Sequence, residues 1–541
     1  MQAAFLCVCL VASICFLYVS TLESREPSSA SFPRILRGKK QEVVKEGIEI
    51  IASNIVGPSI PQLTSSMLER LIEWHESGLW DEKTNGKIDP VLVYNAAKLQ
   101  AEKWVPSWKP RKMWPAGTVI QVLLVSTAED YFTFVAIFHS ACSRALHNQS
   151  RPHKLKRDHL THFALYSRMD RIFYDSVEGI MAHPQINVTM WGPGWAGWEG
   201  GLKANGEENV MRKFGCEYFD IILFHQEHYQ MASCSRLFKT IVVQELGDCP
   251  GPCVAHFSPK AHVVSHTYAS PLWEMYDVDK RVDLMEKRRL FVHNPHCAND
   301  RMMRPAPWEP RQKWAVENHT ISLHGQITGT WYPLRWRLEA GARDGGMNVT
   351  VHQYAGWTFP HNFQSGNYIP VYYDVKDPRL ESVEKQKFEF AASLQSSAVC
   401  AFDAQTMHIM LRKYPEAMLT GCPIFATLPD ELSEIIRPAV FVVDDQKLGD
   451  AERYGYKLRE HVNEAIQDER GRALKGAYGM IASREHFTCY SKAERWLDAV
   501  EAYKQGATGT MYPFSVKVGC REYPGFPKPH AWCYQNDPVM K

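Results

Sequence analysis

One stretch of the chain, residues 413–427, has the sequence KYPEAMLTGCPIFAT and predicts a short helix followed at once by a buried strand. Pro415 suits the first helical turn, because the N–H that proline lacks would have no partner there. Gly421 suits the turn that ends a helix, because glycine tolerates a left-handed backbone. A helix that leads directly into an apolar strand is typical of an α/β sheet.

Two charged residues of this stretch, Lys413 and Glu416, lie at the start of the predicted helix. A helix N-terminus attracts phosphate, a neighbouring lysine neutralises its charge, and a carboxylate there can accept hydrogen bonds from ribose hydroxyls. The alternative is helix electrostatics alone, since an acid in the first turn contributes only about 0.3–1 kcal/mol. The stretch resembles the donor-site motif of nucleotide-sugar-dependent glycosyltransferases with the GT-B fold. It is most similar to the spore-maturation CgeB-like branch of the family-1 and family-4 type transferases.

The resemblance implies an α/β protein of GT-B architecture, with two Rossmann-like, doubly wound parallel-sheet domains that face a cleft. Residues 118–300 are expected to bind the acceptor, and residues 301–505 are expected to bind the donor. The implied reaction transfers a sugar from a nucleotide-diphosphate sugar to a glycan, protein or lipid acceptor. Such enzymes usually hold the diphosphate with the helix dipole and basic side chains, so neither a metal ion nor another cofactor is expected.

Two successive runs of alternating strand and helix patterns agree with this architecture. Residues 119–125 are continuously apolar, which is typical of a strand buried on both faces. The segment 295–314 is rich in proline and polar residues and is interpreted as the linker between the runs. The expected strands are 119–125, 186–191, 218–224, 239–244 and 261–265 in the first run, and 320–324, 348–352, 397–402, 422–426 and 439–443 in the second. The expected helices include 129–147, 160–181, 451–467 and 492–503. This order predicts a parallel sheet in each domain.

The loop that follows the first strand of the second run forms the other part of the expected donor site. It has the sequence HGQITGTWYPLR at residues 324–335. Gly325 and Gly329 would let backbone N–H groups approach a diphosphate, and Arg335 could pair with it. In CgeB-like proteins a glycine-bearing loop followed by Tyr-Pro-Leu-Arg has this position. The alternative is a plain strand–helix turn with a surface arginine.

His408 is a departure from the family pattern. Family-4 type retaining enzymes carry two glutamates separated by seven residues, and the first of them touches the sugar. Eight residues before Glu416 this chain has His408 in place of that first glutamate. The resemblance therefore does not extend to the retaining mechanism of family 4. His408 is either a phosphate or sugar contact or a core histidine.

An inverting GT-B enzyme needs a base near the acceptor hydroxyl, in the first domain. Three residues at predicted strand ends are candidates, namely Asp130, His225 and Glu245. His225 titrates near neutral pH, as a base should, although any one of the 22 histidines is more often structural. Residues 191–198, WGPGWAGW, could stack on an acceptor sugar or pack into the domain core.

The N-terminal twenty residues include an uncharged apolar run, 3–19. Residues 1–20 are therefore expected to be a signal-anchor transmembrane segment, with a cleaved signal peptide as the alternative. Residues 21–117 are expected to form a stem and a helical accessory region, with helical periodicity at 43–55 and 62–78. Residues 506–541 have no readable periodicity and are expected to be a tail, which could cross back onto the first domain.

Four glycosylation sequons and 14 cysteines favour an oxidising, luminal environment. The positive charges that follow the apolar run favour the opposite orientation. The balance predicts a single-pass type II protein of the Golgi or endoplasmic reticulum membrane, with its bulk in the lumen. The sequons begin at Asn148, Asn187, Asn318 and Asn348.

Other functions are compatible with the same sequence. A nucleotide-sugar epimerase or a phosphorylase could share the fold, although no lysine can be singled out for the pyridoxal phosphate of a phosphorylase. A catalytically inactive sugar- or nucleotide-binding surface or structural protein is the rival from another class. The net charge of +1 gives no reason to expect a nucleic-acid partner. The CPGPC segment at 249–253 lacks a second Cys or His pair, which makes a zinc site unexpected.

Overall fold

The structure is a computed structural model that describes part of the chain. The described residues are 62–78, 88–106, 109–115, 117–125, 153–154, 183–191, 199, 206–215, 219–225, 240–246, 261–268, 289–298, 303–327, 329, 331–352, 389–406, 408–444 and 451–511. The predicted anchor at 1–20, the candidate base Asp130 and the predicted helices 129–147 and 160–181 lie outside these residues. Within the described ranges, no helix has both the length and the apolarity needed to cross a bilayer.

Eight of the described strands form one sheet, in the order β13-β7-β6-β5-β4-β1-β3-β2. Its neighbouring strands are parallel except for the pair β2 and β3 at one edge. The strands are β1 (Ile120–Val125), β2 (His153–Lys154), β3 (Ile186–Trp191), β4 (Ile221–His225), β5 (Ile241–Leu246), β6 (Val263–His266), β7 (Leu290–His293) and β13 (Gly509–Met511). The predicted parallel sheet of the first domain is confirmed. The strands β2, β7 and β13 were not expected from the sequence.

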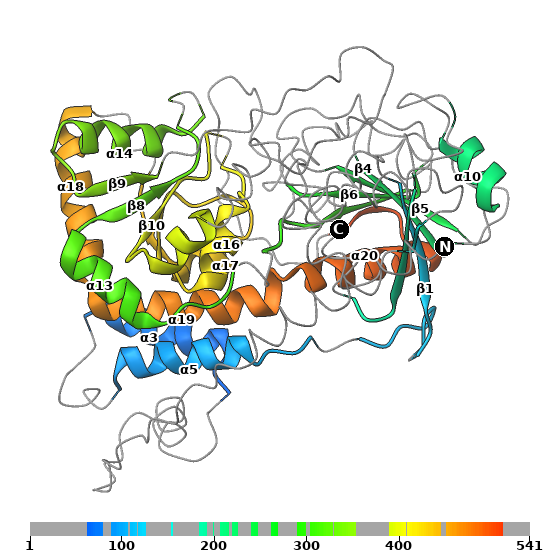
Figure 1. Cartoon of the computed structure of the whole chain (residues 1–541), viewed down its shortest axis with the longest axis horizontal. Helices are drawn as coiled ribbons and strands as arrows, with labels where there is room; N and C mark the ends of the chain where they lie inside the picture. The colour runs from blue at the N-terminus through cyan, green and yellow to red at the C-terminus, as the bar shows by residue number, and fades with distance from the viewer. Residues whose placement is uncertain are drawn as a thin grey trace, which may run out of the picture. The chain divides into compact units, whose positions relative to one another are not determined.

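The core of this sheet includes a helix from the far end of the chain. Helix α20 (Cys489–Lys504) packs on the strands, and Trp496, Leu497 and Val500 belong to the same buried cluster as Val242 of β5. Figure 1 shows α20 beside the labelled strands of this sheet. The expected boundary at residue 505 assigned this helix to the second domain. By packing it belongs with the first sheet, because its apolar side chains lie in the buried cluster of those strands.

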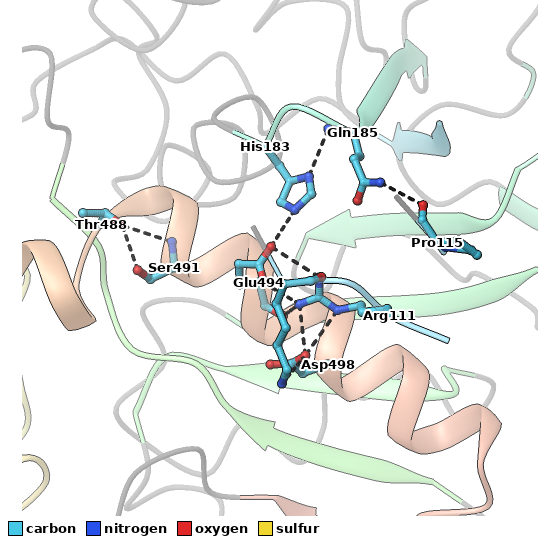
Figure 2. A network of polar contacts seen from close by, with 9 residues as sticks. Arg111, Pro115, His183, Gln185, Thr488, Ser491, Glu494 and Asp498 are labelled. Carbon is cyan, nitrogen blue, oxygen red and sulfur yellow. Dashed lines mark hydrogen bonds and ion pairs between the residues drawn. The ribbon is translucent and has the colours of Figure 1, made fainter. Parts of the chain in front are cut away.

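A buried polar network fixes α20 to the segment that leads into β1 (Figure 2). The Arg111 guanidinium bonds both Glu494 and Asp498 of α20, with Nη2 2.6 Å from Glu494 Oε2 and 3.0 Å from Asp498 Oδ1. His183 Nε2 lies 2.7 Å from Glu494 Oε1, and His183 Nδ1 accepts from the N–H of Gln185. His183 therefore carries its proton on Nε2 and donates it to Glu494. The segment before β1 that contains Arg111 thus packs on the first domain.

Five parallel strands form the second sheet, in the order β12-β11-β10-β8-β9. They are β8 (Ile321–His324), β9 (Val349–His352), β10 (Cys400–Ala401), β11 (Ile424–Ala426) and β12 (Val440–Val442). All five predicted strands of the second run are present, which confirms the second parallel sheet. The associated helices are α13 (Trp308–Asn318), α14 (Pro333–Arg343), α16 (Lys413–Thr420), α17 (Ser433–Ile436), α18 (Ala451–Gln467) and α19 (Glu469–His486), with the 3-10 turn η6 (Arg437–Ala439). A short helix, α10 (Gly206–Phe214), follows β3 in the first domain.

Two helices from the predicted stem region pack on the second domain. These are α3 (Ser65–Glu76), which matches the helical pattern at 62–78, and α5 (Pro90–Glu102), which was not expected. Both contact α19, and Figure 1 shows the three helices together. The Tyr94 hydroxyl of α5 accepts from Arg311 Nε at 2.9 Å and donates to the Ala306 carbonyl at 3.0 Å. Helices α3 and α5 are therefore part of the packed body of the protein.

The predicted linker 295–314 is helical in its second half. Helix α13 begins at Trp308, and Arg311 is fully buried. The Arg311 guanidinium donates to the carbonyls of Leu394, Ser397 and Thr420. This segment joins the residues before β10 to the end of α16, so it is more than a connector. The prolines suggested a break, but Pro307 and Pro310 lie at and just inside a helix start, where proline is tolerated.

Candidate functional site

The carboxyl end of β8 brings two cations to one glycine. Gly325 directly follows β8 and has a φ of +100°, a conformation that residues with a side chain rarely adopt. A Cβ atom placed there would lie 2.5 Å from Lys413 Cε and 2.9 Å from Arg335 Nη1. Glycine therefore lets Lys413 of α16 and Arg335 of α14 approach this turn together without displacement. In open parallel sheets, ligands bind at this end of the strands.

Arg335 is 1% exposed and holds the loop after β8 in place. Its Nη1 donates to the Gln326 carbonyl at 3.0 Å, and its Nε lies 3.1 Å from Asp403 Oδ1. The guanidinium carbon also lies 3.8 Å from the ring centroid of Tyr332. Burial raises the pKa of Asp403, and the positive charge of Arg335 opposes that rise. Arg335 thus fixes the Gly325–Gln326 turn and places a positive charge beside it.

Helix α16 has the start and end that the sequence predicts. Lys413 is its first residue, Pro415 lies in its first turn, and Gly421 ends it with a φ of +75°. Lys413 is only 4% exposed, so its charge acts in a largely desolvated setting. Glu416 is 7% exposed, and its Oε1 lies 2.8 Å from Arg412 Nε at the N-cap position. The carboxylate expected to bind ribose is thus paired with an arginine at the same helix end.

The other two expected donor-site residues lie in neighbouring loops of the second domain. His408 has a φ of +49°, and its Nδ1 lies 3.5 Å from the Leu428 carbonyl oxygen. Its own carbonyl accepts from the Asp430 N–H at 2.8 Å, which joins the loop after β10 to the loop after β11. Gly329 lies against the Trp336 indole, whose nearest carbon would be 3.6 Å from an added Cβ. The structure therefore brings Gly325, Arg335 and Lys413 together, and records different contacts for His408 and Gly329.

Glu245 is part of the core of the first domain. Its side chain is fully buried, its Oε1 lies 2.9 Å from Lys492 Nζ, and its Oε2 accepts from Trp496 Nε1 at 3.0 Å. Both partners come from α20, so this carboxylate fastens the helix to β5. These contacts give the Glu245 carboxylate a structural role, and its role as a candidate base stays a prediction. His225 ends β4 in register with Glu245, and its side chain lies outside the described residues.

Several residues of the site could not be identified from their sequence neighbourhood. Asp403 follows β10 without a motif, and only the fold brings it to Arg335. The rings of His324 and His352 stack with centroids 4.8 Å apart, because β8 and β9 end in register. The shared pattern of a histidine at the last position of two strands was the available signal. Among the described residues, no group of three or more His, Cys, Asp or Glu side chains could hold a metal ion.

Comparison with known proteins gives matches among solved structures. No protein-family model matches the chain, and no curated protein matches it either. Anabaena Alr3699/HepE in complex with UDP and glucose is 11% identical, with a TM-score of 0.36 over 71% of this chain and 100% of that one. Sucrose-phosphate synthase from Thermosynechococcus elongatus is 12% identical, with a TM-score of 0.37 over 71% of this chain and 98% of that one. AviGT4, a glycosyltransferase involved in avilamycin A biosynthesis, is 12% identical, with a TM-score of 0.31 over 72% of this chain and 99% of that one. At these TM-scores, the functional argument depends on the geometry of the site.

Proposed function

We propose that this protein is a glycosyltransferase that uses a nucleotide-diphosphate sugar as its donor. The observation that carries the proposal is the convergence of Lys413 and Arg335 on Gly325 at the carboxyl end of β8. Two nearly buried cations beside a turn that lacks a side chain suit a compact, doubly charged anion such as a diphosphate. The start of α16 adds the partial positive charge of a helix N-terminus.

Each residue of the site has a distinct role in this proposal. Lys413 neutralises the diphosphate, and its effect grows as negative charge develops on the leaving group. Gly325 allows the phosphate to approach the backbone, and Arg335 holds the turn in its bound shape. Glu416 accepts hydrogen bonds from the ribose, while Arg412 holds its carboxylate in position.

The acceptor is proposed to bind at the carboxyl ends of the first sheet, within residues 118–300. In open parallel sheets, ligands bind outside the carboxyl ends of the strands. Asp130, His225 and Glu245 stay the candidates for the base, and α20 already binds the Glu245 carboxylate. A glycan, protein or lipid acceptor in the secretory pathway is the proposed context, and the glycosylation test in the Discussion addresses it.

The test is a thermal-shift screen of the full chain against UDP, GDP and their sugar conjugates. A nucleotide at one hundred times its dissociation constant stabilises the folded state by about 2.7 kcal/mol. We expect a clear preference for one nucleotide class and its loss in Lys413→Met. The matched control is Lys313→Met, because Lys313 is an exposed lysine on α13. A chain that no nucleotide stabilises would refute the proposal.

Hydrolysis of the bound donor separates an enzyme from an inactive binding protein. The enclosure of Glu245 is the observation that favours the inactive alternative, because one expected base is committed to structure. Slow release of free sugar by the wild-type chain, absent in Lys413→Met, is expected for an enzyme. Tight binding without any release over long incubation would favour the binding protein.

A further inference from the structure

A pair of stacked histidines lies beside the candidate anion site. His324 is the last residue of β8, immediately before Gly325, and is fully buried. Its ring is almost parallel to that of His352, with an angle of 2° and centroids 4.8 Å apart. Phe390 contacts the edge of His324, and Trp314 lies near His352. Aromatic neighbours thus pack against both imidazoles, and burial also encloses His324.

The hydrogen bonds of Ser393 assign the proton of His324. The Ser393 hydroxyl donates its single hydrogen to the Phe390 carbonyl at 2.8 Å. In its 3.4 Å contact with His324 Nδ1, the hydroxyl oxygen must therefore accept. Neutral His324 then carries its proton on Nδ1, and Nε2 retains a lone pair that can bind another proton.

Charged groups from three neighbouring elements act on His324. Lys413 of α16, Arg335 of α14 and His352 of β9 each disfavour its protonation, and burial has the largest effect. Together they hold the pKa of His324 well below its ordinary value, and burial also lowers the pKa of His352. Asp403, after β10, faces Arg335 and partly balances its charge. Two of the opposing charges are the cations that would face a bound diphosphate.

We propose that the His324–His352 pair takes up one proton when a diphosphate binds beside Gly325, so that protonated His324 becomes a third cation of the anion site. This inference rests on the proposed function, because it requires a diphosphate ligand. The physical reason is direct. A dianion beside Lys413 and Arg335 cancels the charges that oppose protonation of His324, and it attracts the new imidazolium as well.

Linkage converts this idea into a measurable pH dependence. If binding takes up one proton, the affinity must increase as the pH falls, by up to about tenfold for each pH unit. The increase ends below the pKa of His324 in the free protein, where the proton is already bound. UDP-glucose and GDP-glucose are suitable probes, because a diphosphate esterified at both ends does not titrate between about pH 5 and about pH 8.

The experiment is calorimetric titration of the full chain with each probe at several pH values, in two buffers of different ionisation enthalpy. We expect uptake of a fraction of a proton that grows toward one as the pH falls. His324→Asn should bind with an affinity that no longer depends on pH. His352→Gln should keep the dependence and move its midpoint to higher pH, because one group that opposes protonation is gone.

His486→Gln is the matched control. His486 is a half-buried histidine at the end of α19, with its pKa lowered to about 4 by burial and by Arg495. Its substitution should leave proton uptake unchanged. Probe binding without proton uptake, or the same pH dependence in His324→Asn as in the wild type, would overturn this inference and leave the proposed function standing. Failure of both probes to bind at every pH would overturn the proposed function as well.

Discussion

At the scale of single residues, the site depends on a glycine at which an added Cβ atom would collide with neighbouring side chains. The Gly325 turn combines a left-handed backbone with two cations in the space that a Cβ would need. Arg335 is committed to Asp403 and to the Gln326 carbonyl, so its position is fixed before any ligand arrives. Such preorganisation avoids the entropy cost of ordering long side chains on binding.

Gly325→Ala should abolish nucleotide binding and lower the free energy of unfolding by about 1–3 kcal/mol, because backbone strain and displacement of Lys413 add together. The matched control is Gly345→Ala, whose φ is +68° but whose Cβ would meet nothing within 4 Å. The control should show the strain alone and keep binding. Urea unfolding and thermal shift with nucleotide measure both effects. Equal behaviour of the two variants would show that crowding at Gly325 is unimportant.

A second prediction at this scale concerns the pH dependence of stability. Burial opposes ionisation of Glu494, but the hydrogen bonds from His183 and Arg111 outweigh it and lower its pKa. A carboxylate with a lowered pKa stabilises the folded state above its unfolded-state value of about 4.3, and this stabilisation is lost as the pH falls through the folded-state pKa. Glu494→Gln should therefore flatten the fall in urea midpoint that the wild type shows below about pH 5. An unchanged acid profile in the variant would contradict this role.

At the scale of helices and strands, local patterns predicted the elements better than their partners. Pro415 and Gly421 predicted both ends of α16, because proline and glycine act through their own backbones. The continuous apolar run at 119–125 predicted β1 for a similar reason. The pair Arg335–Asp403 could not be predicted, because only the folded sheet brings these residues together. For His324 and His352 the expected strand ends were a signal, but their contact depends on β8 and β9 being neighbours in the sheet. For the same reason, the pattern of α20 indicated an apolar face but not the sheet that the face covers.

Element context also distinguishes among the predicted glycosylation sites. Asn318, at the end of α13, and Asn348, just before β9, are exposed. Asn187 lies inside β3, where its amide donates to Gln121 Oε1 at 2.7 Å. If the chain enters the secretory pathway as proposed, Asn318 and Asn348 should carry glycans and Asn187 should not. Mass spectrometry after enzymatic deglycosylation tests this, and unmodified Asn318 and Asn348 would count against a luminal location.

At the scale of the whole molecule, the first domain is assembled from distant parts of the chain. Residues 111–114 and the strands β1 to β7 form one part, and α20 with β13 forms the other. The disulfide between Cys297 and Cys489 joins the two parts across a sequence separation of 192 residues. The strands β8 to β12 lie within that interval and form the sheet of the second domain, which includes the second disulfide, Cys400–Cys422.

A chain that ends at residue 488 should therefore fail to fold its first domain. It would lack the helix that covers the sheet and the strand that pairs with β7. A chain that ends at residue 511 is the control and should unfold as cooperatively as the full chain. Limited proteolysis and denaturant unfolding compare the three proteins. A protease-resistant first domain in the shorter chain would show that α20 is dispensable.

The late arrival of α20 has a consequence for how the protein is made. The ribosome completes β7 long before it reaches Cys489, and translation proceeds at roughly 5–20 residues per second. The intervening 192 residues therefore take on the order of 10–40 seconds to synthesise. Throughout that delay, the first sheet has an apolar face without its covering helix, while the second domain can already begin to fold. The strands β1 to β7 are thus synthesised first, but their domain can be completed only after α20 emerges, near the end of translation.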